Sequence, residues 1–196
     1  MRYIKTGVLL LLCSVLLAGC GSSKNLSLSK CTDTTILIHK DGSVDQVIVE
    51  TFDESYYDEE ELKNFINTQV EFYNNQNEGH KIKASSLKEK RKNMKIKLEY
   101  DSLESYSAFN SVTADTFGVE KASEIQIIPD TFVSVSDSKT VDSSEIVGNS
   151  QYKILYINDA CNIQMEGEMK YYSGAVVLNN TTLQTTSGEP AVIVYE

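Results

Sequence analysis

Cysteine and histidine are the residues of this chain that could make it a catalyst or a metal protein. The sequence contains four cysteines and two histidines, His39 and His80. A zinc site needs several of these ligands at short spacing, but neither H-E-x-x-H nor a C-x-x-C pair occurs. The glycine-rich loops that hold phosphate groups do not occur either. We therefore expect no metal and no cofactor.

A cysteine nucleophile would depend on Cys161, which follows Asn158-Asp159-Ala160 near a predicted hairpin bend. His39 or His80 could fold beside it and act as the base. A lone cysteine is more commonly a buried, inert thiol. A serine hydrolase would need the elbow G-x-S-x-G, which the sequence lacks. We therefore expect no catalytic residue.

Basic residues gather in one segment, although the chain as a whole has a formal net charge of −10. They could contact anionic lipid headgroups or envelope polymers. Alternatively, lysines on the polar face of an edge hairpin protect it from pairing with other chains, and their alternating spacing favours this interpretation. The cluster consists of Lys81, Lys83, Lys88, Lys90, Arg91, Lys92, Lys95 and Lys97.

The chain begins with the pattern of an export signal. Arg2 and Lys5 precede an apolar run over residues 8–17, and small residues follow. This run is shorter than the roughly 20 apolar residues that span a bilayer. We therefore interpret residues 1–19 as a signal peptide.

The end of this signal, Leu17-Ala18-Gly19-Cys20, resembles the lipobox of bacterial lipoproteins. The resemblance implies that a type II signal peptidase cuts before Cys20 and that the Cys20 sulfur carries a diacylglyceryl group. Two palmitate-type acyl chains suffice for stable membrane anchoring, whereas one does not. The alternative is an ordinary signal peptide with an incidental cysteine.

Cleavage would change both the charge and the cysteine content. Removing residues 1–19 takes away two basic residues and no acidic one, so that the net charge becomes −12. Nucleic acid is then an unfavourable partner. With Cys13 removed and Cys20 lipidated, Cys31 and Cys161 remain. Outside the cytoplasm they could form a disulfide, and two unpaired thiols are the alternative.

Hydrophobic periodicity predicts an α+β fold, with antiparallel sheets and about two helices. Asp41-Gly42 is typical of a tight hairpin between two strands. The first half has the order ββα-ββα. Its predicted elements are strands 35–39 and 44–52, helix 59–76, two strands within 80–100 that turn near 90–93, and a helix at about 102–112.

The C-terminal half is strand-rich. Residues 134–150, rich in Ser and Asp, are expected to form a mobile surface loop. The predicted strands are 125–128, 131–135, 151–157, 163–172, 175–178 and 191–195.

Together these patterns predict three regions: a lipoprotein signal peptide (1–19), a flexible tether with lipidated Cys20 (20–33) and a single globular domain (34–196). The expected location is the extracytoplasmic face of the cell membrane. The expected partners are the membrane, through the anchor, and an unidentified protein or envelope polymer. We expect a non-enzymatic binding or scaffolding module. The alternative is a cell-envelope hydrolase or redox accessory enzyme that uses Cys161 or a carboxylate pair.

Overall fold

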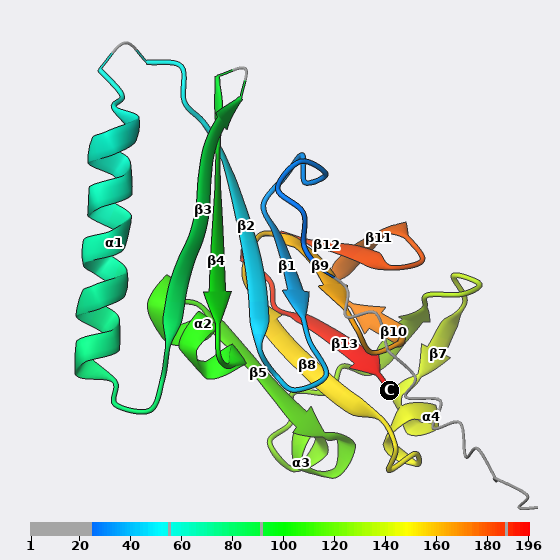
Figure 1. Cartoon of the computed structure of the whole chain (residues 1–196). Coiled ribbons are helices and arrows are strands. Elements are labelled where there is room, and N and C mark those ends of the chain that lie inside the picture. Colours follow the sequence, from blue (N-terminus) through cyan, green and yellow to red (C-terminus); the bar gives the residue numbers. More distant parts are fainter. Residues whose placement is uncertain (1–24, 55, 91, 187) are drawn as a thin grey trace, which may run out of the picture.

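The computed structural model describes residues 25–196 except residues 55, 91 and 187. In this part of the chain thirteen strands form two sheets, and four helices accompany them in an α+β fold (Figure 1). In chain order the elements are β1 (Thr35–Ile38), β2 (Val44–Thr51), α1 (Glu59–Gln76), β3 (Ile82–Lys90), β4 (Asn93–Tyr100), α2 (Leu103–Asn110), β5 (Thr113–Gly118), α3 (Val119–Glu124), β6 (Thr131–Ser134), β7 (Thr140–Asp142), α4 (Ser143–Val147), β8 (Lys153–Asn158), β9 (Asn162–Met165), β10 (Met169–Ser173), β11 (Ala175–Asn179), β12 (Thr182–Thr185) and β13 (Ala191–Tyr195).

The seven-stranded sheet, called sheet A, has the strand order β11-β12-β9-β1-β2-β4-β3. β1 and β2 form a hairpin whose turn contains Gly42 at φ +88°, where a residue without Cβ is favoured. The hairpin β3–β4 continues the sheet beyond β2. On the other side β9 runs parallel to β1, with Ile36 beside Ile163. Parallel neighbours need a crossover, and here the crossover contains much of the second sheet.

The six-stranded sheet, called sheet B, has the order β5-β8-β13-β10-β6-β7. The chain leaves sheet A after α2 and returns to it as β9. It then crosses to sheet B as β10, back to sheet A as β11 and β12, and ends in sheet B as β13. Because the chain alternates between them, neither sheet is built from one continuous stretch of the sequence.

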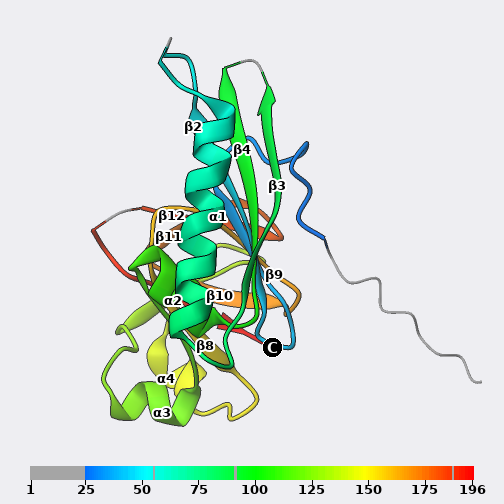
Figure 2. The ribbon, with the colours of Figure 1, turned by 60° about the vertical axis from the view of Figure 1, so that its left-hand side comes forward.

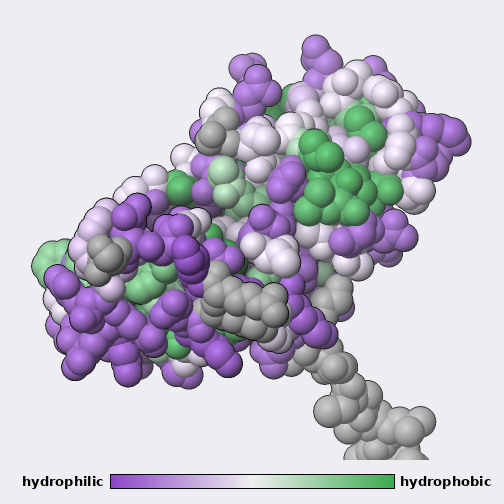
Figure 3. All heavy atoms as spheres, turned by 90° about the horizontal axis from the view of Figure 1, so that it is seen from above, coloured by the Kyte–Doolittle hydropathy of each residue, from purple (hydrophilic) through white to green (hydrophobic). Residues whose placement is uncertain are grey.

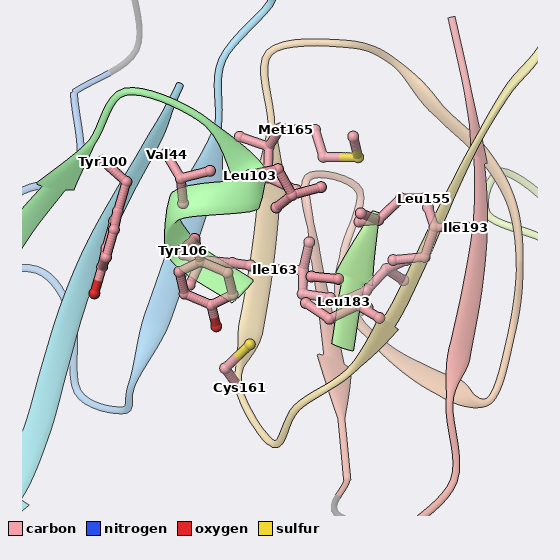
Figure 4. Close-up of a cluster of buried hydrophobic side chains, with 14 of the residues drawn as sticks. Val44, Tyr100, Leu103, Tyr106, Leu155, Cys161, Ile163, Met165, Leu183 and Ile193 are labelled. Atoms are coloured by element: carbon pink, nitrogen blue, oxygen red, sulfur yellow. The ribbon is translucent and has the colours of Figure 1, made fainter. Parts of the chain in front are cut away.

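The largest cluster of buried side chains lies where the two sheets meet. Val44 and Ile163 of sheet A share it with Leu155 and Ile193 of sheet B, and Tyr106 of α2 lies among them (Figure 4). α1 runs alongside β3 and β4 and covers part of the same face of sheet A (Figure 2). A second cluster lies under α3 and α4, on the other face of sheet B.

Most elements of the first half were predictable. The helix expected at 59–76 is α1 with these bounds, and Asp58 caps it by accepting a hydrogen bond from the Glu61 N–H at 2.9 Å. The two strands expected within 80–100 are β3 and β4, which meet at the expected turn. The helix expected at about 102–112 is α2. The predicted α+β class is confirmed.

Several predictions for the second half were wrong. Residues 125–128 are not a strand, and Ile127 and Ile128 instead pack beside α3. Residues 134–150 contain β7 and α4 in place of a long loop. The expected strand 163–172 is two strands in different sheets, joined at Gly167, where a Cβ would lie 2.7 Å from the Glu196 carbonyl oxygen. The strands β5 and β12 and the short helices α3 and α4 were not predicted.

Candidate functional site on the outer face of sheet A

Side chains alternate between the two faces of sheet A. Ile36 and Ile38 point into the largest cluster, so we call that side the inner face. Leu37 and Val47 belong to a third, separate cluster on the opposite side, the outer face. The other outer-face residues of β1, β2 and β4 used below are Asp45, Val49, Lys95, Lys97 and Glu99.

Residues 25–33, called the N-terminal segment, are packed against this outer face. Leu26 is 5% exposed and Cys31 is 7% exposed, and both contact the cluster of Leu37 and Val47. A turn shapes the segment, since the Cys31 N–H donates to the Ser27 carbonyl at 3.3 Å. The apolar side chains of the segment therefore form a small core of their own.

Lys95 of β4 fastens the N-terminal segment to the sheet. Its Nζ donates to the carbonyl oxygen of Leu28 at 3.2 Å and also to the carbonyl oxygen of Cys31. The expectation of a flexible tether over 20–33 is therefore wrong for residues 25–33. The folded part of the chain begins before residue 34.

An ion-pair network occupies the same face. Lys97 Nζ lies 2.8 Å from Asp45 Oδ2 and 3.4 Å from Glu99 Oε1, and the Lys97 side chain is only 12% exposed. Burial lowers the pKa of Lys97, but the two carboxylates outweigh burial and raise the pKa overall. For the acid Glu99 the signs are reversed. Burial raises its pKa, but a hydrogen bond with Ser85 and the charges of Lys97 and Lys83 outweigh burial and lower the pKa overall. The network therefore favours fully charged groups.

The predicted basic cluster lies on the β3–β4 hairpin, but its members differ in their surroundings. Lys83 pairs with Glu99 at 3.4 Å. Lys95 binds the N-terminal segment, and Lys97 belongs to the ion-pair network. Lys81, Lys88 and Lys92 are exposed, and no ion pair joins them to another described residue. The side chain of Lys90 and the whole of Arg91 lie outside the described part of the chain.

Acidic residues also lie next to this hairpin. The Phe52 N–H donates to the Lys92 carbonyl at 2.6 Å, and this contact joins the hairpin turn to the loop that leads into α1. That loop and the first turn of α1 carry Asp53, Glu54, Asp58, Glu59, Glu60 and Glu61. The tip of the hairpin is therefore a mixed-charge surface.

The two cysteines that remain after the predicted cleavage are free in this structure. Cys31 lies in the outer-face cluster and Cys161 in the largest cluster, so sheet A separates them and the disulfide allowed by the sequence is not formed. Burial, followed by the charge of Asp159, raises the pKa of Cys161 to about 12. The thiol lies near Tyr106 (Figure 4), whose hydroxyl donates to Asp159. A thiol in this environment is a poor nucleophile.

A polar cluster at the start of α2 consists of Ser105, His80 and Asp101. The spacing of these residues in the sequence did not suggest this grouping. Ser105 Oγ lies 3.2 Å from His80 Nδ1 and donates to Asp101 Oδ1 at 2.5 Å. In a hydrolytic triad the serine hydroxyl donates to the histidine, and the carboxylate holds the other ring nitrogen. Here the serine donates to the carboxylate and is fully buried. The cluster instead closes the start of α2, where Ser102 accepts from the Ser105 N–H at 3.0 Å.

His39 lies between two carboxylates at the rim of a cleft. Its Nε2 is 3.7 Å from Asp45 Oδ1, and its Nδ1 is 3.4 Å from Glu166 Oε1. The cleft has a volume of about 720 Å³ and separates the β1–β2 turn from sheet B. Its polar and aromatic lining residues include Lys40, Asp41, Thr116, Tyr152, Lys153, Tyr195 and Glu196. His39 thus lies next to two carboxylates at the rim and does not lie beside Cys161 as a base.

Within the described ranges no three histidine, cysteine or acidic side chains are grouped so that they could hold a metal ion. None of the described helices has the length and apolarity needed to cross a membrane. No family model matches the chain, and comparisons with curated proteins and with solved structures find no similar protein.

Proposed function

We propose that this protein is a lipid-anchored, non-enzymatic binding or scaffolding module on the extracytoplasmic face of the cell membrane. Residues 1–19 act as the signal peptide, and Cys20, which lies outside the described residues, carries the lipid. The outer face of sheet A is then the side that lies toward the membrane.

The observation that carries this proposal is the packing of the N-terminal segment. Leu26 and Cys31 are buried on the outer face, and Lys95 binds the segment. Only residues 21–24 separate Cys20 from Asn25. Fully extended, this stretch spans about 17 Å. The domain is therefore held close to the lipid surface with one face toward it.

Binding is favoured over catalysis by the state of the reactive side chains. Cys161 is buried with a raised pKa, and Ser105 is buried and donates to a carboxylate. The exposed Lys81, Lys88 and Lys92 are available for anionic headgroups or an envelope polymer. Each basic side chain near an anionic surface contributes on the order of 1 kcal/mol.

The anchor is tested by Cys20→Ser in the full chain expressed in a bacterial host, with Cys13→Ser as the matched control. We expect the wild type and the control to partition into detergent and to carry the mass of a diacylglyceryl group. Cys20→Ser should lose both properties. If Cys20→Ser still acquires the lipid mass, or the wild type never does, the proposal is wrong.

A further inference from the structure

The cleft between the β1–β2 turn and sheet B has the size and the lining of a small-molecule site. Its volume of about 720 Å³ falls within the range of roughly 300–1,000 Å³ that is typical of such sites. The lining includes buried apolar side chains, since Leu103 is 7% exposed and Met165 is 2% exposed. It also includes the half-buried rings of Phe117, Tyr152 and Tyr195. The cleft therefore suits a ligand with an aromatic ring.

Two lysines of the lining have no ionic partner. Lys40 belongs to the β1–β2 turn and Lys153 begins β8, so they come from the two sides of the cleft. Both are exposed, and no ion pair joins either of them to another described residue. A lysine ammonium group carries a positive charge and three N–H donors but no acceptor. Both lysines are therefore available to an anionic ligand.

The acidic residues of the lining, by contrast, already have partners within the protein. Asp41 Oδ1 accepts hydrogen bonds from the Ser43 N–H at 3.0 Å and from the Ser43 hydroxyl at 2.6 Å. Glu196 Oε2 lies 3.2 Å from Lys170 Nζ. These carboxylates therefore do not pair with the two lysines of the cleft.

Two further carboxylates lie at the rim, on either side of His39. Asp45 Oδ2 is 2.8 Å from Lys97 Nζ, and Glu166 Oε2 accepts a hydrogen bond from the Lys40 N–H at 3.0 Å. The charges without an ionic partner in the lining are therefore positive, although the chain as a whole is acidic.

The sides of the cleft are held in place by contacts within the protein. Backbone hydrogen bonds between Glu168 and Glu196, at 3.0 and 3.1 Å, fix the end of β13. The ring of Tyr152 packs edge-on against Tyr171, with centroids 6.0 Å apart. A site that is already formed loses little conformational freedom when a ligand binds.

The cleft and the tip of the β3–β4 hairpin lie at opposite ends of sheet A (Figure 1). Val44, next to the β1–β2 turn, is in register with Tyr100, whereas Thr51 is in register with Asn93 at the hairpin tip. The tip and the start of α1 lie toward the viewer in Figure 3, where this part of the surface is largely hydrophilic. An inference about the cleft therefore does not rest on the basic cluster or on the proposed anchor.

We propose that this cleft binds a small organic anion that has an aromatic ring, such as an aromatic carboxylate. Its anionic groups pair with Lys40 and Lys153, and its ring lies against the aromatic and apolar lining. A neutral ring lacks the first contact, and inorganic phosphate lacks the second. The proposal therefore predicts that charge and ring are both needed for binding.

The first test measures how a ligand protects lysines of the full chain in nonionic detergent. The probe is isophthalate, a benzene ring with two carboxylates, and mass spectrometry quantifies the acetylation of each lysine by a limiting reagent. We expect millimolar isophthalate to slow the labelling of Lys40 and Lys153 roughly threefold or more. Labelling of the exposed Lys121 on α3 should not change.

Two further probes separate the parts of the ligand in the same experiment. Benzamide carries the ring without a charge, and inorganic phosphate carries the charge without a ring. Both should protect the two lysines much less than isophthalate does. No protection by isophthalate, or equal protection by phosphate, would overturn the proposal.

The second test measures the dissociation constant of isophthalate by calorimetry. Lys153→Gln removes one positive charge from the cleft, and Lys121→Gln removes one from α3, where the lysine lies 3.2 Å from Glu124. We expect Lys153→Gln to weaken binding roughly fivefold or more and Lys121→Gln to stay within about a factor of two of wild type. Both lysines are exposed, so both variants should keep the unfolding midpoint of the wild type. Equal affinities of the two variants contradict the proposed site.

Discussion

Lys97 and Lys83 differ in burial although they share a partner. Both approach Glu99 at 3.4 Å, but the Lys97 side chain is 12% exposed and the Lys83 side chain is 72% exposed. Only Lys97 also neutralises Asp45, whose side chain is 10% exposed. A charge that loses its partner inside a protein costs much more than one at the surface.

Replacing Lys97 with Met should therefore destabilise the domain by about 2–3 kcal/mol, because Asp45 loses its cation. Lys83→Met is the matched control and should change stability by less than about 1 kcal/mol. Urea unfolding at neutral pH measures both variants. Equal losses would mean that the buried part of the network contributes nothing specific.

The N-terminal segment acts as an added element of sheet A. It has no strand or long helix of its own, and Leu26 with the two hydrogen bonds from Lys95 holds it in place. Next to the proposed lipid anchor, this position would place the outer face of sheet A near the membrane. The stability of this small cluster would then matter for orientation as well as for folding.

Leu26→Ala should lower the free energy of unfolding by about 2–3 kcal/mol, because it leaves a cavity over Leu37 and Val47. Amide exchange at Cys31, whose N–H bonds to Ser27, should become faster. Lys30→Ala, at an exposed position of the same turn, is the control and should change neither quantity. If both variants resemble the wild type, the segment does not depend on its apolar contacts.

Across the entire domain, sheet A separates two sides with different surroundings. The N-terminal segment lies on the outer face, while α1 packs on the inner side beside β3. With about 17 Å of chain between the lipid and Asn25, the proposed anchor would keep the outer face near the membrane and α1 away from it. Partners arriving from outside would then meet α1 first.

This orientation predicts the response of fluorescent probes on the anchored protein. A probe at Ser29→Cys on the outer face should be quenched strongly by headgroup-labelled lipid, and a probe at Thr68→Cys on α1 weakly. Cys31 and Cys161 are buried, and burial raises the pKa of both thiols, which favours selective labelling of the new cysteine. Equal quenching at the two positions would contradict the orientation.

Local signals in the sequence were sufficient to predict several of the helices, strands and turns. The periodic apolar residues of α1, its Asp58 cap, the Asp41-Gly42 turn and the alternation in β4 each depend on neighbouring residues alone. The same signals failed where long-range packing decided the outcome. Residues 125–128 have the composition of a strand, yet they pack beside α3, and the break at Gly167 depends on Glu196, far along the chain.

The α+β class, the order of the first six elements and the position of the basic cluster could be read from the chain without its fold, because they follow from local spacing. Folding in three dimensions was needed to make Lys97 an internal ion-pair partner, to place Cys31 and Cys161 on opposite faces of a sheet, and to pack residues 25–33. It also placed β11 and β3 at the two edges of sheet A. These properties arise from contacts between segments distant in sequence, and burial and pairing are set only when the sheets assemble.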